Sequence, residues 1–212
     1  MDEPLDIVTA TGAHVRSAGR REVHDGGHWH QVFHCLVVRS APPARVVLQR
    51  RHRAKVAFPG LLDLSATGHL TAGERPVDGV RELNEELGIQ VTPADLVPIG
   101  VRLLADDDGG EGHNRERVHL FFVTDDRPLD HYDPDPDEVE SLVEVGAGDL
   151  LRLFDHQPHP APSVEACEWQ PGSPPVQVTI DRSDLVAPVD GYWIVLLVMA
   201  ERFVASEGPL AI

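Results

Sequence analysis

The chain has 212 residues, of which 42% are hydrophobic and 25% charged, proportions typical of one globular domain with embellishments. Its 35 acidic residues against 18 basic ones give a formal net charge of −17, which disfavours a nucleic-acid polymer as partner. Two cysteines make no disulfide framework, the first ten residues show no signal peptide, and the apolar run 192–200 is too short to span a bilayer. We therefore expect a cytoplasmic protein without a membrane partner.

Strands dominate the expected structure, because β-branched runs alternate with turn residues along most of the chain. The strands at 5–9 and 14–17 are expected to form a hairpin that turns at Gly12. Residues 24–27 are a turn, and residues 50–55 form a basic loop. We expect strands, in chain order, at Leu5–Thr9, His14–Ser17, Gln31–Arg39, Arg45–Gln49, Leu62–Ser65, Leu96–Leu104, Arg117–Thr124 and Glu138–Val145.

The clearest helix is expected at Pro76–Leu87, where apolar residues recur every three or four positions and Pro76 suits the first turn. Gly88 then serves as its C-cap. Ala147–Leu153 and Gly191–Ser206 predict two further helices. The proline-rich stretch Pro158–Pro175 is interpreted as a loop. Strands interleaved with a few helices indicate a mixed α/β sandwich.

Three carboxylates on the first of these helices indicate the chemistry. Glu82, Glu85 and Glu86 are spaced so that they share one face, where their charges repel one another. A divalent cation relieves that repulsion, and hard oxygen ligands suit Mg²⁺ or Mn²⁺. The alternative is an acidic helix face that is simply solvated, which is the usual meaning of such a pattern on its own.

The segment around these glutamates resembles the Nudix box, whose pattern is Gly, five residues, Glu, seven residues, then Arg-Glu-apolar-x-Glu-Glu-x-Gly-apolar. Arg81–Ile89 match the second half at every specified position and Gly68–Glu74 match the first, although the spacer between them has six residues instead of seven. The resemblance implies one domain over 1–212 with its core at about 28–155. It also implies an α/β fold: a Nudix-type α/β/α sandwich with a mixed central β-sheet, to which the N-terminal hairpin is added.

The same resemblance implies roles for the box residues. Glu82, Glu85 and Glu86 would bind Mg²⁺ or Mn²⁺, and Arg81 would orient Glu82. The catalytic base in this family is either a box glutamate or a glutamate of a later loop, for which Glu138 is the candidate here. The shortened spacer leaves open whether Glu74 takes its family position.

Further matching segments outside the box are Leu5–Val8, Arg20–His24, Trp29–His30, Gln49–Arg51 and Phe58–Gly60. Through them the chain resembles the isopentenyl-diphosphate-isomerase-like branch of the family. In the true isomerases, histidines that match His24, His30 and His69 hold a divalent metal, and residues that match Arg51 and Lys55 grip the diphosphate. Basic residues beside an acidic pocket are reasonable phosphate ligands. We therefore expect Arg51 and Lys55 to bind substrate, and we interpret the three histidines as structural remnants.

Isomerase activity is not expected, because the isomerase needs a cysteine immediately before the Gly-His pair and this chain has Thr67 there. A threonine hydroxyl cannot replace the more acidic thiol as acid or base. Of the two glutamates that the isomerase has around Asn114–Arg117, only Glu116 is reproduced. We therefore expect hydrolysis of a diphosphate linkage in a small molecule, such as a nucleoside diphosphate derivative. An isomerase-like enzyme, a non-catalytic binding module and a homodimer stay open.

Overall fold

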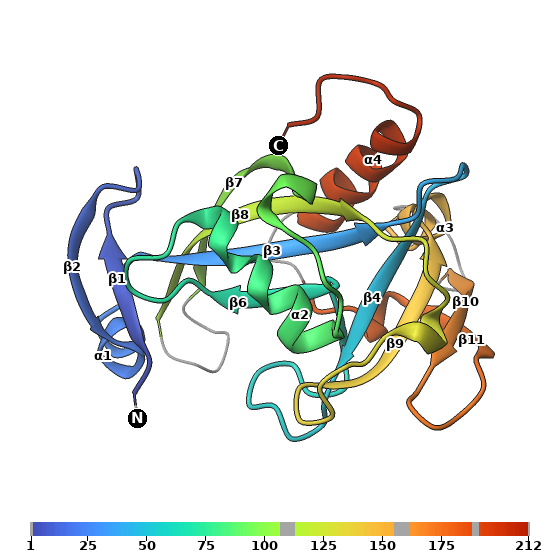
Figure 1. The fold of residues 1–212 in the computed structure, drawn as a ribbon, viewed down its shortest axis with the longest axis horizontal. Coiled ribbons are helices and arrows are strands. Elements are labelled where there is room, and N and C mark those ends of the chain that lie inside the picture. Colours follow the sequence, from blue (N-terminus) through green and yellow to red (C-terminus); the bar gives the residue numbers. More distant parts are fainter. Residues whose placement is uncertain (1, 107–112, 155–161, 188–190, 212) are drawn as a thin grey trace.

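The computed structural model describes residues 2–106, 113–154, 162–187 and 191–211 (Figure 1). The strands are β1 (Pro4–Val8), β2 (His14–Gly19), β3 (His30–Val38), β4 (Arg45–Arg51), β5 (Leu62–Asp63), β6 (Ala66–His69), β7 (Val97–Asp106), β8 (Asn114–Thr124), β9 (Val139–Gly146), β10 (Ser163–Trp169) and β11 (Val176–Asp181). The α-helices are α1 (Arg20–Asp25), α2 (Arg81–Leu87), α3 (Ala147–Arg152) and α4 (Tyr192–Val204). Short 3₁₀ helices lie at Pro76–Val80, Pro93–Asp95, Leu129–His131 and Arg182–Asp184.

One large mixed sheet organises the fold. Its strand order is β11-β10-β9-β4-β3-β8-β7, with β5 paired to β4 and β6 paired to β3. The central pair β3–β8 is parallel, whereas the other pairs of the sheet are antiparallel. β1 and β2 form a separate two-stranded sheet at one end of the molecule (Figure 1). The mixed central sheet and the additional N-terminal hairpin expected from the sequence are both confirmed.

The central strands are apolar on both faces, which explains the continuous hydrophobic run Cys35–Val38 in β3. Successive side chains of a strand point to opposite faces. Accordingly Leu36 and Val38 of β3 join one core cluster, while Phe33, Cys35 and Val37 join another. A sheet that is buried on both faces needs such runs in place of a polar and apolar alternation.

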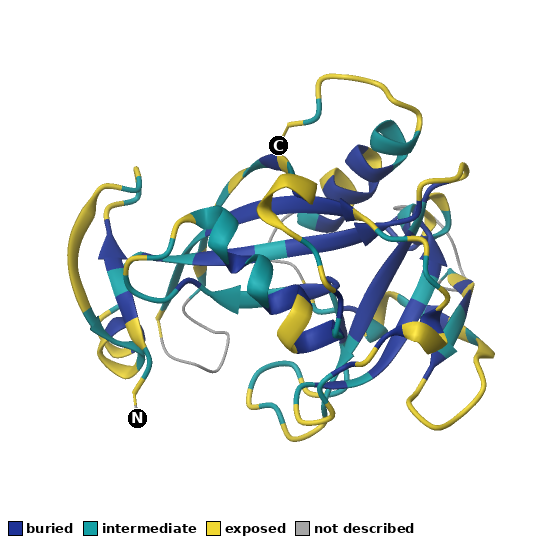
Figure 2. Ribbon diagram, viewed as in Figure 1, coloured by how far each residue is buried: buried dark blue, intermediate teal, exposed yellow. Residues whose placement is uncertain are grey.

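Helices cover both faces of the sheet, as the sandwich prediction requires. Leu83 and Leu87 of α2 pack in the cluster on one face, and Leu196 and Leu197 of α4 pack with α3 in the cluster on the other. Figure 2 shows the central strands buried between these layers, whereas β2 at the end of the molecule is largely exposed. Of the helices in the described part of the chain, none has the length and apolarity needed to cross a membrane.

Three local predictions were wrong. Arg20–Asp25 form the short helix α1 and not a stretch that leads into a turn at 24, although its C-cap is Gly26. Ala66–His69 add the strand β6, which the short predicted strand at 62–65 did not include. Within the proline-rich stretch, Ser163–Trp169 form β10, which pairs with β9 and β11, and residues 158–161 lie outside the described part. The prolines flank this strand and do not interrupt it, so every backbone N–H of the strand stays available.

The helix predicted at Pro76–Leu87 is a 3₁₀ helix over Pro76–Val80 followed by α2. A 3₁₀ helix rises about 2.0 Å per residue against 1.5 Å for an α-helix. Five residues in that form therefore extend farther than five in an α-helix. The expected single helix is therefore two helical segments of different form, and the second of them begins at Arg81.

Replacing the buried Arg39 by alanine is expected to destabilise the fold by about 3 kcal/mol. Its guanidinium bonds the Glu144 carboxylate at 2.8 Å and the carbonyl oxygens of Asp125 and Arg127 at 2.6 and 2.7 Å. Arg45, which bonds the same carboxylate but is 40% exposed, is the matched control, and its alanine variant should lose less than about 1 kcal/mol. Chemical denaturation of both variants measures the free energy of unfolding. Equal losses of stability would contradict the conclusion that the buried contacts of Arg39 stabilise the fold more than the exposed one of Arg45.

The effect of Arg39→Ala should also depend on pH. Burial raises the pKa of Glu144, but the guanidinium groups of Arg45 and Arg39 outweigh it and leave that pKa below its ordinary value. A carboxyl group whose pKa is lowered by folding stabilises the fold above its unfolded pKa, and this contribution is lost as the pH falls through the folded value. The difference between wild type and variant should therefore be largest near neutral pH and smaller in acid.

Candidate active site

A cleft of about 600 Å³ lies where α2, β6 and the loop before β9 meet the sheet. Its volume is in the range usual for small-molecule sites. Every catalytic, substrate-binding and metal-binding candidate named from the sequence lines this cleft: Arg51, Lys55, Arg81, Glu82, Glu85, Glu86 and Glu138. The fold thus brings together residues from three separate stretches of the chain.

Arg81 organises the first half of the site. It donates to Glu74 at 2.8 Å, to the Glu82 carboxylate at 2.7 Å and to the Glu85 carboxylate at 2.9 Å. A fourth hydrogen bond reaches the backbone carbonyl of His69 at 2.9 Å. Glu74 therefore contacts Arg81, but it is not among the described residues that line the cleft.

Glu82 and Glu86 are buried carboxylates, 9% and 7% exposed. Burial raises the pKa of Glu82 to about 7 against the lowering effect of Arg81, and burial with repulsion from Glu82 raises the pKa of Glu86 to about 8. Oε2 of Glu86 accepts hydrogen bonds from the Gln49 side chain at 2.9 Å and from the Thr67 amide at 3.0 Å. Two buried carboxylates that resist ionisation are a donor set that a divalent cation fits, since it supplies the missing positive charge.

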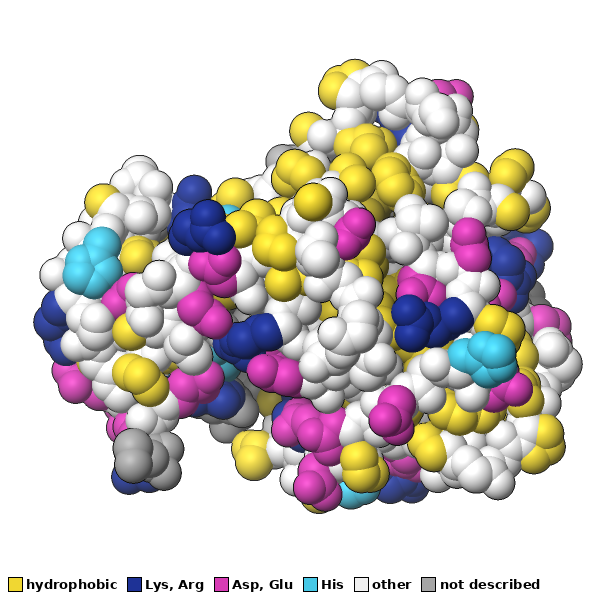
Figure 3. All heavy atoms as spheres, in the orientation of Figure 1, with side chains coloured by type: hydrophobic (Ala, Val, Ile, Leu, Met, Phe, Trp, Pro, Cys, Tyr) yellow, Lys and Arg dark blue, Asp and Glu magenta, His cyan; other side chains and the backbone are white. Residues whose placement is uncertain are grey.

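Glu85 completes the set on the same helix and is more exposed, with 55% of its side chain accessible. Like charges held by one helix face repel one another, so we do not expect the three carboxylates to converge fully unless a cation joins them. Figure 3 shows acidic side chains gathered along the lower part of the face that carries α2, in keeping with the net charge of −17.

Gly68 makes room for the Glu82 carboxylate. A Cβ at this position would lie 2.0 Å from Oε1 and 2.1 Å from Cδ of Glu82. Real Cβ atoms do not approach other heavy atoms so closely, so any larger residue here must displace the carboxyl group. The first glycine of the box therefore has a direct spatial reason, which its place in the sequence does not reveal.

Backbone hydrogen bonds dock the loop that carries Glu138 onto the C-terminal end of α2. The amides of Asp133 and Asp135 donate to the carbonyls of Leu87 and Glu86, both at 3.1 Å. Gly88 ends the helix with a φ of 67°, and a Cβ there would lie 2.6 Å from the Asp133 carbonyl oxygen. This close approach and the left-handed backbone both call for glycine. The loop can therefore place Glu138 at the cleft.

The two expected substrate-binding cations already have acidic partners. Lys55 Nζ contacts the Glu138 carboxylate. Arg51 donates to the carboxylate of the half-buried Asp63 at 3.1 Å and to the carbonyl of Ala57 at 3.0 Å. Asp63 was not singled out from the sequence, and Gln49 was not assigned a role in the site. No local signal marks their roles, because each residue matters only through a partner that the fold brings to it.

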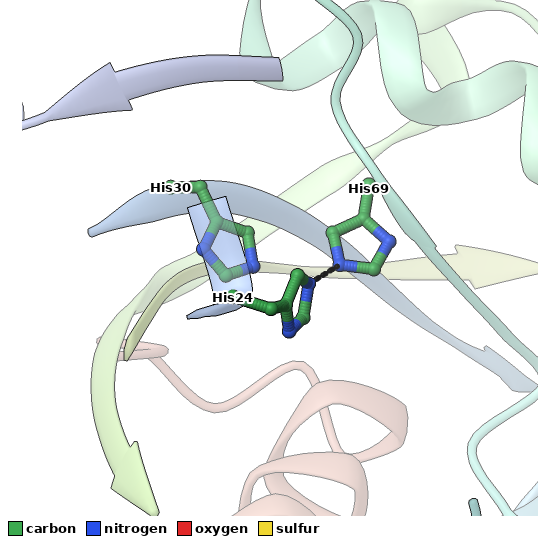
Figure 4. Close-up of side chains that lie close together, drawn as sticks. All are labelled: His24, His30 and His69. Carbon is green, nitrogen blue, oxygen red and sulfur yellow. Dashed lines mark hydrogen bonds between the residues drawn. The ribbon is translucent and has the colours of Figure 1, made fainter. Parts of the chain in front are cut away.

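The three histidines that were interpreted as remnants lie together in space. His24 comes from α1, His30 begins β3 and His69 ends β6, and their possible ligand atoms lie within 4.8 Å of one another. Figure 4 shows the rings turned toward one another, with Nε2 of His24 and of His69 3.3 Å apart. His30 donates through Nδ1 to the His28 carbonyl at 3.0 Å, so in the neutral ring Nε2 is the nitrogen that can accept or bind a metal. Among the described residues this group could hold a metal ion.

Comparison with known proteins identifies the class of molecule that this fold and site define. The model of the NUDIX domain family matches residues 28–167, more than half of the chain. An uncharacterized Nudix hydrolase of Clostridium acetobutylicum is 36% identical over 157 residues, covering 74% of this chain and 76% of the relative. The chain therefore belongs to the Nudix family, and it is an enzyme of the pyrophosphohydrolase type.

Further similarities agree with this family and with its isomerase-like branch. An isopentenyl-diphosphate Delta-isomerase of Cutibacterium acnes is 31% identical over 163 residues, covering 74% of this chain and 80% of the isomerase. The solved structure of a Deinococcus radiodurans protein is similar in fold, with a TM-score of 0.52 at 21% identity, covering 70% of this chain and 86% of that one.

Proposed function

We propose that this enzyme hydrolyses a diphosphate linkage in a small molecule with the help of Mg²⁺ or Mn²⁺ held by Glu82, Glu85 and Glu86. The observation that carries the proposal is the pair of buried carboxylates, Glu82 and Glu86, beside a cleft that also presents Lys55 and Arg51. A diphosphate is the ligand that needs both parts, because a cation joins it to the carboxylates and the basic residues bind its remaining oxygens.

Each protein group then has a distinct task. Arg81 orients Glu82 and Glu85 through its two short hydrogen bonds, and Gln49 with the Thr67 amide orients Glu86. Glu138 can accept a proton from the water that attacks phosphorus, and Lys55 places positive charge beside the phosphate oxygens. When bound, the cation neutralises the diphosphate and polarises its phosphorus.

The isomerase alternative is disfavoured by the residues beside the substrate. Thr67 stands where the isomerase needs a thiol, and its hydroxyl cannot exchange protons with an allylic carbon near neutral pH. Of the two glutamates that the isomerase has around Asn114–Arg117, only Glu116 is reproduced here, and it accepts a hydrogen bond from Asn114 at 2.8 Å. The His24, His30 and His69 group by itself does not restore that chemistry, since it supplies no acid beside the substrate carbon.

A metal-dependent activity screen tests the proposal. Nucleotides, sugar nucleotides and prenyl diphosphates are incubated with the enzyme and Mg²⁺ or Mn²⁺, and phosphate-containing products and deuterium uptake from D₂O are measured. We expect hydrolysis that a chelator abolishes and no deuterium in isopentenyl diphosphate. Tight binding of substrates without turnover would support the non-catalytic module, and deuterium uptake well above background would support the isomerase.

Replacing Lys55 by alanine is expected to raise KM roughly ten- to hundredfold with a smaller change in kcat, because a charge-assisted contact to phosphate contributes about 1.5–3 kcal/mol. Arg53→Ala is the matched control, since Arg53 is a neighbouring cation that is 78% exposed and does not line the cleft. Arg51→Ala should also raise KM, but it leaves the half-buried Asp63 without its cation and should lower stability as well. Unchanged KM values for Lys55→Ala and Arg51→Ala would exclude the proposal that these two residues bind the diphosphate.

A further inference from the structure

A second group of linked side chains lines the same cleft and contains no box residue. Tyr192, the first residue of α4, bonds through its hydroxyl to Nδ1 of His34 at 3.0 Å. The guanidinium carbon of Arg102 lies 4.3 Å from the centre of the Tyr192 ring, a cation–π arrangement. All three residues line the cleft. They are not used by the hydrolytic steps described above, so their place in the cleft calls for another role.

The fold brings these three side chains together from distant parts of the chain. Val32 and His34 have the same parity on β3 as Leu36 and Val38, so they point to the sheet face that α4 covers. Val32 is paired with Val118 of β8, and Val118 is paired with Arg102 of β7, so Arg102 emerges on that face too. The N-terminal end of α4 then places Tyr192 against His34 and Arg102.

All three side chains are polar, and each carries a planar group. A guanidinium is planar and offers only hydrogen-bond donors. His34 stays neutral in the protein, because burial and the charges of Arg102 and Arg51 lower its pKa to about 3. The His34–Tyr192 pair can therefore both donate and accept without adding charge. This part of the cleft suits a planar ligand group with acceptor atoms on its edge.

We propose that Arg102, Tyr192 and His34 are the specificity-determining residues for the group that the diphosphate carries, and that they select a planar group rich in nitrogen and oxygen acceptors over an apolar chain. An apolar chain can neither accept a hydrogen bond from these side chains nor stack on them through a π system, whereas a planar acceptor group can do both. Sites built to make hydrogen bonds reject ligands that cannot make them. The inference rests on the proposed function, since it concerns the remaining part of the same substrate.

The test compares wild type with Arg102→Ala, Tyr192→Phe and Tyr192→Leu, with Arg152→Ala as a control at an exposed arginine of α3. Thermal denaturation first establishes that each variant is folded. The value of kcat/KM is then measured for nucleoside diphosphate sugars with each of the four bases, and for isopentenyl and geranyl diphosphate. In parallel, calorimetry measures the binding of AMP, GMP, CMP and UMP.

We expect wild type to prefer at least one nucleoside substrate, and Arg102→Ala to lower kcat/KM for it roughly ten- to hundredfold while hydrolysis of prenyl diphosphates changes little. Tyr192→Leu should act in the same direction and Tyr192→Phe less, whereas Arg152→Ala should match wild type. A preference for prenyl diphosphates, or a preference that Arg102→Ala leaves unchanged, would overturn the specificity inference but not the hydrolase. If nothing is hydrolysed, the proposed function fails. The specificity inference is then decided by whether wild type binds any of the four monophosphates and Arg102→Ala weakens that binding tenfold or more.

Discussion

Replacing Glu86 by glutamine is expected to lower turnover at least about a hundredfold while the fold stays intact. Glu86 is 7% exposed, and its Oε2 accepts from Gln49 and from the Thr67 amide. A glutamine carbonyl oxygen can accept the same two hydrogen bonds, so the local structure should persist. The variant loses the negative charge that a divalent cation requires. Without metal, its thermal stability should equal or exceed that of wild type, because burial and Glu82 disfavour the charged carboxylate.

Glu85→Gln should have a comparable effect on turnover, although Glu85 is more exposed and its side chain contributes less to packing. Steady-state kinetics over a Mg²⁺ titration and a direct Mn²⁺ binding titration measure both variants. Glu165→Gln, an exposed glutamate on β10, is the control and should match wild type. If either box variant keeps nearly full activity at saturating Mg²⁺, the assignment of the metal ligands is wrong.

The second large effect is expected for Gly68→Ala, which should weaken Mn²⁺ binding roughly ten- to hundredfold and reduce activity in parallel. The added methyl group would lie 2.0 Å from the Glu82 carboxylate oxygen, so that carboxyl group must move. The atoms in conflict are the end of a side chain and not backbone. The loss of stability should therefore stay at about 1–3 kcal/mol, as for other overpacked sites.

Gly208→Ala controls for the loss of a glycine as such, because a Cβ at Gly208 meets nothing within 4 Å. That variant should bind Mn²⁺ and turn over substrate as wild type does. Circular dichroism and thermal denaturation establish that Gly68→Ala is folded before its metal affinity is measured. Wild-type Mn²⁺ affinity in a folded Gly68→Ala protein would show that the position of Glu82 does not govern metal binding.

The contacts of the box residues show how far a sequence pattern can go toward a site. The spacing of Glu82, Glu85 and Glu86 predicts a shared helix face, and all three line the cleft. The pattern does not predict that Arg81 bonds two of them and Glu74 as well. It also does not indicate that the first part of the expected helix, Pro76–Val80, is a 3₁₀ helix.

The three histidines and two missed elements show what depends on the fold. The histidines were interpreted as remnants because isomerase chemistry was not expected, and α1, β3 and β6 bring their possible ligand atoms within 4.8 Å of one another. The prediction missed α1 because a six-residue helix is too short to give a clear apolar period. It missed β10 because prolines at the ends of a strand resemble prolines in a loop, and only the pairing with β9 and β11 separates the two.

By itself the sequence determined the family, the apolar strands of a sheet covered on both faces, the N-terminal hairpin and the helix that carries the glutamates. These features depend on local spacing, which is fixed by the period of a strand or a helix. Tertiary structure alone decided which residues complete the site. Gln49 supports Glu86, Asp63 holds Arg51, and Tyr192 bonds His34 across 158 positions of sequence. Strand register and helix docking set such contacts, and both depend on the packing of the whole sheet.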